Sequence, residues 1–301
     1  MEIRTLRYFL AVAREGNMTR AAGGLHVTQP TLSKALRALE DELGKRLFTR
    51  HSFSISLTEE GALLRDRAED LLLMVDKIEQ EFLSLDEVTG GDLYLGLAES
   101  YQIRYLAREI KRLKDRYPDL RYHITSGDTE QVTERLDKGL LDFAVLCGLP
   151  NERRYEHLLF PEVDYFGLVM RKDDCLAGRE GIRVGDLVGL PLFCSKQSWE
   201  GDIRPWAKER FGELRLEGSF RLAYNGSVFV KEGLGYLLAL DGLVDTSSES
   251  GLVFRPLSPA LEVPLCLAWG RRQTLTPIAK RFLDQLRAVF AVCGREDHFA
   301  P

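Results

Sequence analysis

The sequence predicts an N-terminal all-α winged helix-turn-helix, a long linker helix and a C-terminal two-lobed α/β domain. Three observations lead to this prediction. Three helical patterns end in a short alternating segment by residue 58, an apolar heptad repeat fills residues 59–85, and strand and helix patterns alternate from about residue 90. The 301 residues, 45% of them apolar and 29% charged, have the composition of a globular protein of two or three domains.

Two helices are predicted before residue 27. In LRYFLAVARE the apolar residues recur at helical spacing, and MTRAAGGLHV continues as a shorter second helix that begins near Thr19. Gly23 and Gly24 each lower helix stability by about 1 kcal/mol relative to alanine. We therefore expect a neighbouring helix to pack closely against this glycine pair.

The third helix is predicted by the stretch TQPTLSKALRALEDELG. Thr28 is a suitable N-cap, because its hydroxyl can accept a hydrogen bond from a free N–H of the first turn. Pro30 falls in that turn, where its missing N–H removes no helical hydrogen bond, and Gly44 is expected just past the helix end. Leucines form the buried stripe, while Gln29 and Ser33 lie on another face, which we expect to be exposed.

A two-stranded wing is predicted by the alternating segment RHSFSISL, with its tip near residues 52–54. Three helices, a short turn between the second and third, and a wing make up a winged helix-turn-helix. Residues 1–58 carry nine Lys and Arg against five Asp and Glu, a charge of +4, whereas the remainder carries −9. A basic small domain joined to an acidic large one favours a nucleic-acid reader with an unrelated second part.

A heptad seam runs through residues 59–85, which would form a helix roughly 40 Å long. Its apolar residues are spaced alternately four and three positions apart, the pattern of a coiled coil. We expect a dimerisation helix, the alternative being an internal core helix. The predicted contact residues are Leu64, Ala68, Leu71, Val75, Ile78, Phe82 and Leu85.

From residue 90, strand patterns such as DLYLGLA and DFAVLCG alternate with helix patterns such as those over 102–117, 199–211 and 276–290. This alternation predicts a mostly parallel α/β architecture. The segment is longer than one such sheet usually needs, so we expect two lobes. A ligand-binding cleft between them would lie at the carboxyl ends of the strands.

Several stretches match the pattern of one known family. In the first 65 residues these are LRYFLAVAREGNMTRAAGGLHVTQPTLSKALRALEDELGKRLFTR and LTEEGALL; downstream, more loosely, they are LYLGLAES, LLDFAVL and KEGLGYLLAL. Through them the chain resembles the LysR-type transcriptional regulators of bacteria. The resemblance implies a DNA-binding domain over 1–58, a linker helix over 59–89 and a periplasmic-binding-protein-like effector domain over 90–301. Its lobes, RD1 and RD2, are expected at about 91–161 with 266–301 and at about 162–265.

The resemblance also implies function and partners. Such a protein regulates transcription in response to a small-molecule effector bound between RD1 and RD2. Double-stranded operator DNA, the effector and other copies of the chain are its expected partners, with dimers pairing into homotetramers, and RNA polymerase is a further partner of an activator. Since we find no signal peptide and no run of about 18 apolar residues, we expect a bacterial cytoplasmic, nucleoid-associated protein without membrane contact.

Reading DNA requires short polar side chains on an exposed helix front, flanked by cations for the phosphates. The third helix and the wing supply both, although a capped, solvated helix face shows a similar pattern. The predicted DNA-binding residues are Thr19, Arg20, Thr28, Gln29, Pro30, Thr31, Ser33, Lys34, Arg37, Arg50, His51 and Ser52.

Small effectors are held by polar groups at strand ends and helix N-termini. Four segments supply such groups, although each side chain could instead be a helix cap. The predicted effector-binding residues are Glu99, Ser100, Tyr101, Gln102, Ser126, Gly127, Asp128, Thr129, Ser195, Lys196, Gln197, Asn225 and Ser227. Glu99 departs from the family, which usually has an uncharged residue there. This carboxylate would either repel an anion or select an effector with an amine.

We expect no enzyme active site, no cofactor and no metal site. The sequence contains no G-x-S-x-G, no P-loop and no G-x-G-x-x-G after a strand, and its five histidines lack metal-ligand spacing. His123 is expected to be a hydrogen-bonded core residue. Two alternatives stay open: a redox pair of Cys175 and Cys194, and a small-molecule binding protein or degenerate enzyme whose N-terminal domain serves only assembly.

Overall fold

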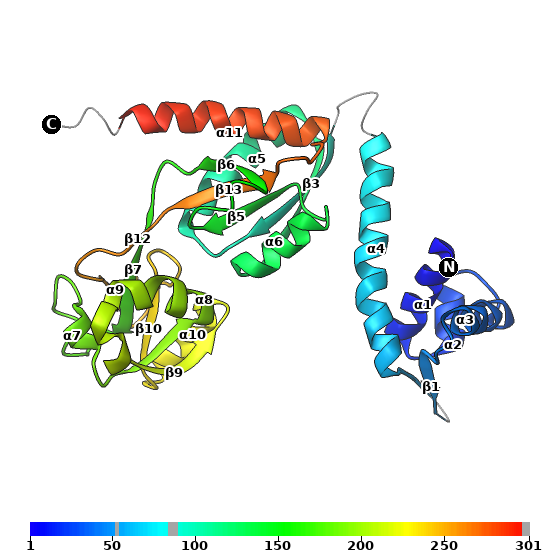
Figure 1. Cartoon of the computed structure of the whole chain (residues 1–301), viewed down its shortest axis with the longest axis horizontal. Coiled ribbons are helices and arrows are strands. Elements are labelled where there is room, and N and C mark those ends of the chain that lie inside the picture. Colours follow the sequence, from blue (N-terminus) through cyan, green and yellow to red (C-terminus); the bar gives the residue numbers. More distant parts are fainter. Residues whose placement is uncertain (52–53, 84–89, 297–301) are drawn as a thin grey trace. The chain divides into compact units, whose positions relative to one another are not determined.

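The computed structural model describes residues 1–51, 54–83 and 90–296, which belong to two compact units, Met1–Leu83 and Ser84–Pro301. The N-terminal unit is the predicted winged helix-turn-helix followed by a long helix (Figure 1). Its core is formed by apolar side chains of the first three helices, with Phe9 and Leu32 fully buried at its centre. The elements of this unit are α1 (Ile3–Glu15), α2 (Met18–Gly24), α3 (Gln29–Leu43), β1 (Phe48–Arg50), β2 (Ile55–Leu57) and α4 (Glu59–Leu83).

The ends of α2 and α3 are set by local capping. Asn17 caps α2, because its side-chain oxygen accepts hydrogen bonds from the N–H groups of Thr19 and Arg20, both at 3.0 Å. The helix therefore begins slightly before the predicted start. For α3 the predicted cap is confirmed: the Thr28 hydroxyl accepts from the N–H of Thr31 at 3.4 Å. Gly44 follows the helix with φ 66°, the left-handed conformation expected of it.

The expectation of a helix packed closely against Gly23 and Gly24 is wrong. A Cβ atom built on either glycine would meet nothing within 4 Å, and both residues are exposed. The two glycines therefore lower helix propensity without allowing any close approach within this chain.

Gly23→Ala is expected to stabilise the N-terminal unit by about 0.5–1 kcal/mol, because alanine has the higher helix propensity and the space is open. Amide hydrogen exchange read by mass spectrometry on peptides from α1 to α3 measures this change. Faster exchange in the variant would contradict the prediction.

The wing is anchored to α3 by one buried carboxylate. Glu40 is 8% exposed and accepts hydrogen bonds from the N–H of Leu47 at 2.8 Å and from the guanidinium of Arg46 at 2.9 Å. A longer bond of 3.3 Å comes from the N–H of Phe48, the first residue of β1. Although burial opposes the charge, these donors lower the pKa of Glu40 below its ordinary value.

The long helix α4 begins in close contact with the wing. Gly61, in its first turn, lies against the backbone of Leu47, so that a Cβ on Gly61 would be 2.1 Å from the Leu47 carbonyl oxygen. That oxygen also accepts from the N–H of Thr58 at 3.0 Å. The start of α4 is therefore fixed to the strand that opens the wing.

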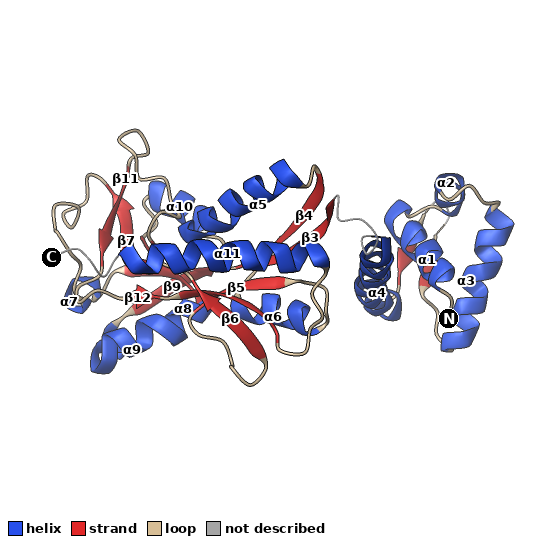
Figure 2. Cartoon of the chain, turned by 90° about the horizontal axis from the view of Figure 1, so that it is seen from above, coloured by secondary structure: helices blue, strands red, loops and turns tan. Residues whose placement is uncertain are grey.

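The C-terminal unit contains two sheets, each with its own core (Figure 2). In the first lobe the strand order is β4-β3-β5-β13-β6. Helices α5 and α11 cover one face of this sheet, and α6 packs on the other (Figure 1). Gly96 lies against α6, while its neighbours Leu95 and Leu97 belong to the core beneath α5 and α11. The elements of this lobe are β3 (Gly90–Leu97), η1 (Tyr101–Ile103), α5 (Arg104–Arg116), β4 (Asp119–Ser126), α6 (Thr129–Asp137), β5 (Phe143–Cys147), β6 (Tyr155–Leu159), β13 (Leu265–Gly270) and α11 (Pro277–Glu296).

In the second lobe the strand order is β11-β7-β10-β8-β9, and β12 pairs with β7. The chain passes from the first sheet to the second between β6 and β7, and returns between β12 and β13. The elements of this lobe are β7 (Asp164–Arg171), α7 (Val184–Leu187), β8 (Pro191–Ser195), α8 (Lys196–Ser198), η2 (Trp199–Ile203), α9 (Arg204–Ala207), η3 (Lys208–Glu213), β9 (Arg215–Phe220), α10 (Ala223–Lys231), β10 (Tyr236–Leu240), β11 (Leu252–Pro256) and β12 (Glu262–Val263).

Two expectations about this unit need correction. The sheets are mixed, because β13 runs antiparallel to β5 and β6, and β7 runs antiparallel to β10 and β11. The helix expected over 199–211 is broken into three short helical turns. Pro205 has no N–H to continue an α-helix, and Lys208 adopts a positive φ of 52°.

Candidate functional site

The exposed front of α3 carries most of the polar side chains that the sequence places there. Gln29, Thr31, Lys34 and Arg37 are exposed. Ser33 is not: it is 9% exposed and lies with the buried side of the helix, so its predicted place on the exposed front is wrong. Ser33 lies three residues before the buried Leu36, at the spacing of one helix face, and therefore sits at the edge of the buried stripe.

The start of α3 is organised by its own side chains. The hydroxyls of Thr28 and Thr31 share a hydrogen bond of 2.8 Å at the helix tip, where Pro30 limits backbone freedom. Exposed N–H groups at a helix N-terminus suit an anionic partner such as a phosphate. The tip therefore offers a rigid polar surface that could contact nucleic acid.

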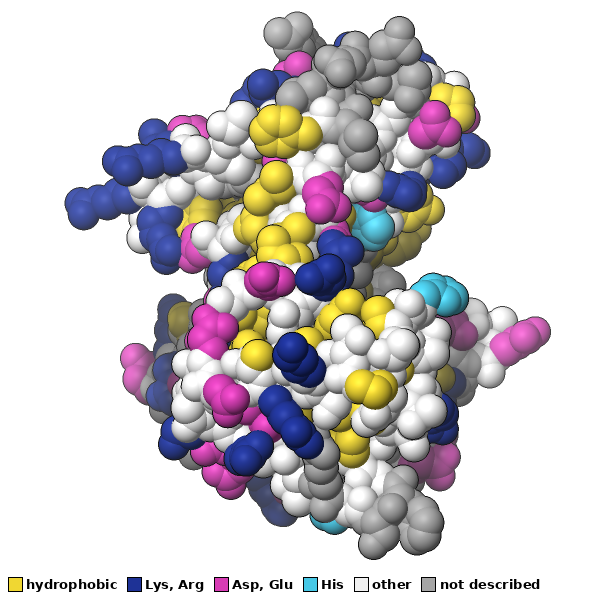
Figure 3. Space-filling model, turned by 90° about the vertical axis from the view of Figure 1, so that its right-hand side faces the viewer, with side chains coloured by type: hydrophobic (Ala, Val, Ile, Leu, Met, Phe, Trp, Pro, Cys, Tyr) yellow, Lys and Arg dark blue, Asp and Glu magenta, His cyan; other side chains and the backbone are white. Residues whose placement is uncertain are grey.

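The predicted DNA-binding residues outside α3 differ in their surroundings. Thr19 is exposed, and the guanidinium of Arg20 donates to the Glu15 carbonyl at 2.6 Å, which holds this cation beside α1. In the wing, the His51 ring is 3.0 Å from the Ser56 hydroxyl. The Arg50 side chain and Ser52 lie outside the described residues. On the face of the molecule that Figure 3 shows, Lys and Arg side chains are interspersed with Asp and Glu.

The predicted apolar seam of α4 is buried near the start of the helix and exposed further along it. Ala68 is 1% exposed and, with Leu64, packs in the core of the N-terminal unit. Further along, Leu71, Ile78 and Phe82 are 40%, 45% and 70% exposed. Val75 is half-buried, and Leu85 lies outside the described residues. The second half of the helix thus presents large apolar side chains to the surroundings.

The two lobes of the C-terminal unit meet through the strand-end residues that the sequence singled out. The side chain of Gln197 bonds reciprocally with Thr129: its oxygen accepts from the Thr129 N–H, and its amide donates to the Thr129 hydroxyl, both at 2.9 Å. The Glu99 carboxylate accepts from the N–H of Ala223, the first residue of α10, at 2.8 Å. Burial raises the pKa of Glu99, although the Ala223 bond opposes the shift.

Several other predicted effector residues serve as local caps. Ser100, Asp128 and Ser195 each accept from an N–H of the helical turn that follows them, at 2.9, 3.0 and 3.1 Å. Ser227 is buried and donates to the Tyr224 carbonyl at 2.7 Å, which directs its hydroxyl into its own helix.

The remaining predicted residues are scattered around these contacts. Tyr101 packs against Gly242 of the second lobe, where an added Cβ would lie 2.9 Å from the Tyr101 Cβ. Gly127 packs against α6. Ser126, Lys196 and Asn225 are exposed. Gln102, by contrast, is 4% exposed, and its side-chain oxygen has no hydrogen-bond partner among the described residues.

Asp164 is a buried acid of this region that the sequence interpretation missed. It is the first residue of β7, where the chain enters the second lobe, and it is 0% exposed. Burial raises the pKa of Asp164 to about 6, and the nearby charge of Asp241 adds to the shift. The sequence marks it only as an acid at the first position of a largely apolar strand, in DYFGLVMR, which does not show that its side chain is buried.

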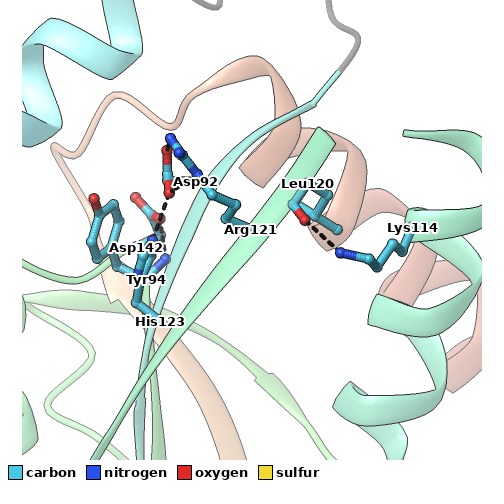
Figure 4. Close-up of polar contacts among 7 residues, drawn as sticks. All are labelled: Asp92, Tyr94, Lys114, Leu120, Arg121, His123 and Asp142. Atoms are coloured by element: carbon cyan, nitrogen blue, oxygen red, sulfur yellow. Dashed lines mark hydrogen bonds and ion pairs between the residues drawn. The ribbon is translucent and has the colours of Figure 1, made fainter. Parts of the chain in front are cut away.

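A second polar cluster joins the first two strands of the first lobe (Figure 4). The Asp92 carboxylate accepts from the Arg121 guanidinium at 2.8 and 3.0 Å and is 2.6 Å from the His123 ring. The His123 ring stacks on Tyr94 with centroids 4.6 Å apart. Its side chain is 47% exposed, so its predicted place in the core is wrong, although it is hydrogen-bonded as expected.

Cys175 and Cys194 lie in different environments, which disfavours a redox pair. Cys194 is fully buried, whereas Cys175 is exposed. Burial raises the pKa of the Cys194 thiol to about 12, with a further contribution from Asp202. Because the thiolate is the nucleophile, such a thiol is unreactive near neutral pH. Within the described residues, no group of three His, Cys, Asp or Glu could hold a metal ion.

Cys194 is expected to react with hydrogen peroxide at least about 100-fold more slowly than Cys175. Trapping of the sulfenic acid with dimedone, followed by peptide mass spectrometry over time, gives both rates in one sample. Equal labelling of the two cysteines would restore the redox-pair interpretation.

Comparisons with known proteins match both units. Residues 3–62 match the family model described as the bacterial regulatory helix-turn-helix protein, lysR family, and residues 86–291 match the LysR substrate binding domain. The Hca operon transcriptional activator HcaR of Escherichia coli is 29% identical over 297 residues, 94% of this chain and 96% of that protein. The dual regulator OxyR of Escherichia coli is 34% identical over 194 residues, covering 64% of this chain and 63% of its own.

Solved structures share the fold over nearly the whole length. The crystal structure of CbnR, a LysR family transcriptional regulator, covers 96% of this chain and 99% of its own, with a TM-score of 0.74 and 20% identity. CbnR in complex with its target DNA matches with a TM-score of 0.72 and 22% identity over the same shares. In the described part of the chain, no helix is both long and apolar enough to cross a membrane.

Proposed function

The chain belongs to the LysR family of bacterial DNA-binding transcription regulators, and from this premise we propose how its parts act. The front of α3 binds operator DNA, and a small molecule bound between the two lobes changes the effect on transcription. The observation that carries this proposal is the exposed polar face of α3, with Gln29, Thr31, Lys34 and Arg37 on a capped helix. Side chains of these types reach base edges in a major groove.

The contacts between the lobes support the placement of the effector. Gln197 with Thr129, and Glu99 with Ala223, bring strand ends and a helix N-terminus of opposite lobes together. A ligand that competes with these bonds, or adds to them, would change how the lobes are held. The proposed effector residues are those predicted from the sequence, with Asp164 added.

Assembly is proposed to run through α4. The exposed Leu71, Ile78 and Phe82 would bury their side chains against a second copy of this helix, and such dimers would pair into a tetramer. The proposed domain limits stay at 1–58, 59–89 and 90–301. We further propose a cytoplasmic, nucleoid-associated regulator that contacts RNA polymerase when it activates.

Gln29→Ala is expected to reduce the preference for the operator over scrambled DNA by about tenfold, because a base-edge contact provides roughly 1–3 kcal/mol of discrimination. Arg50→Ala is expected to weaken binding to both DNAs equally and to lower the magnitude of the slope of log K against log salt concentration by about 1. Fluorescence anisotropy with DNA from upstream of the chain's own gene, at several salt concentrations, measures both quantities.

The control is Arg4→Ala, which removes an exposed cation of α1 outside the proposed interface. It should leave preference and salt slope unchanged. If the wild-type chain bound both DNAs equally, or if Gln29→Ala kept the full preference, the proposed role of α3 would be wrong.

A further inference from the structure

The contact region between the lobes contains buried acceptors that lack donors. Neither carboxylate oxygen of Asp164 has a hydrogen-bond partner among the described residues, and the same holds for the side-chain oxygen of Gln102. Asp164 is 0% exposed and Gln102 is 4% exposed. Buried polar groups of folded proteins almost always have partners, so three orphaned acceptors indicate donors that the chain does not supply.

These acceptors belong to one neighbourhood. The Ser100 hydroxyl and the Gln102 side chain lie close enough to Asp164 to favour its charged form somewhat, although neither meets hydrogen-bond geometry with it. The charge of Asp241, whose carboxylate accepts from the Tyr165 N–H at 2.8 Å, also lies near Asp164. The end of β3 in the first lobe therefore faces the start of β7 in the second.

An anionic ligand would find few groups to bind here. The N-terminus of α10, the natural place for a carboxylate, already holds Glu99 through the Ala223 N–H. The Arg104 guanidinium is paired with Glu162 at 2.6 Å. Lys196, the cation among the predicted effector residues, is exposed. The charged groups that act on Asp164 are Asp241 and the already paired Arg104, so the two carboxylates disfavour a second anion and favour a cation.

We propose that the effector is recognised here through a primary ammonium group that donates to both oxygens of Asp164 and to the Gln102 side-chain oxygen. An ammonium has three donors, and three acceptors lack one. Its positive charge offsets the carboxylate buried at the start of β7. This inference rests on the proposed function, because it specifies the chemistry of the effector expected between the lobes.

Access to the site requires the lobes to separate. Since Asp164 is fully buried, the Glu99–Ala223 and Gln197–Thr129 bonds would open before a ligand enters and form again around it. A ligand that binds this closed state stabilises the folded C-terminal unit by mass action. Thermal unfolding therefore reports binding without any knowledge of the regulated gene.

The test compares n-butylammonium, butyrate and 1-butanol, at equal concentration and pH 8, on the full-length chain. Unfolding is followed by tryptophan fluorescence, because Trp199, Trp206 and Trp269 all belong to the C-terminal unit. We expect a rise of about 2 °C or more in the midpoint with n-butylammonium alone. The rise should be absent in Asp164→Asn, reduced in Gln102→Leu, and retained in Asp173→Asn, which removes an exposed carboxylate of the same lobe.

Three results would overturn the inference: no rise with the amine, an equal or larger rise with butyrate, or a rise that persists in Asp164→Asn. The unliganded midpoint of each variant shows whether it is folded. The same samples are tested for operator binding by anisotropy. If the wild type binds operator DNA specifically but n-butylammonium does not raise the unfolding midpoint, the ammonium site is refuted and the proposed function stands. If the wild type shows no specific DNA binding in the anisotropy assay, the proposed function itself is refuted.

Discussion

Gly61→Ala is expected to destabilise the N-terminal unit by about 3 kcal/mol or more and to abolish DNA binding. The added Cβ would lie 2.1 Å from the Leu47 carbonyl oxygen and 3.1 Å from the Leu57 side chain. Leu47 cannot retreat easily, because its oxygen accepts from Thr58 and its N–H donates to Glu40. Adding a methyl group to a well-packed core usually destabilises the fold by roughly 1–3 kcal/mol. Because this site cannot relax, we expect a cost at or above the upper end of that range.

Hydrogen exchange and fluorescence separate this effect from general unfolding. Peptides from α1 to α3 should lose protection in Gly61→Ala, while the tryptophan-reported transition of the C-terminal unit stays in place. Gly23→Ala is a matched control, because the same methyl group is added to a helical glycine of the same unit in open space. If both variants exchanged like the wild type, the contact between α4 and the wing would not be as close as described.

Asp164→Asn is expected to stabilise the unliganded C-terminal unit by about 2–3 kcal/mol at pH 8. The pKa of Asp164 rises from 3.8 to about 6 on folding, and each unit of such a shift corresponds to roughly 1.4 kcal/mol. Folded wild-type protein holds the proton more tightly than the unfolded chain does. Its stability is therefore favoured below about pH 4, falls as the pH rises to about 6, and then stays level.

Urea unfolding followed by tryptophan fluorescence between pH 4 and pH 8 tests this dependence. The gain in the free energy of unfolding from Asp164→Asn should be small at pH 4 and should reach its full value above about pH 6. In Asp173→Asn the change in stability should stay nearly level over this range, because the Arg171 guanidinium lowers the pKa of that exposed carboxyl and so places its titration below about pH 4. A gain in Asp164→Asn that does not depend on pH would assign the effect to packing and not to the buried charge.

Local features of the fold could be predicted from the sequence because their causes are local. The start of α3 follows from a hydroxyl at Thr28 and a proline within one turn, and its end follows from the conformational freedom of Gly44. The residues at strand ends were predicted in the same way. Of these residues, Thr129 and Gln197, 68 positions apart, bond to each other between the lobes.

What could not be predicted depends on contacts between distant segments. The side that Ser33 faces is decided by how deeply α3 sits in its core, and the glycine that matters for packing is Gly61, not Gly23. The edge strands β6 and β11 were missed because they lack a clear alternation of polar and apolar residues. Asp164 was missed because only the crossing of the chain between the lobes buries it.

The anchoring of the wing by Glu40 has a consequence for building chimeric regulators. The side chains proposed to read DNA occupy residues 29–37, while the carboxylate that fixes the wing lies one helical turn beyond them. The two tasks are therefore assigned to separate turns of one helix. Exchanging only the exposed side chains of this range, Gln29, Thr31, Lys34 and Arg37, would leave the core residues and the Glu40 anchor of the wing in place. Target specificity in this scaffold should therefore be exchangeable without redesigning the domain that presents it.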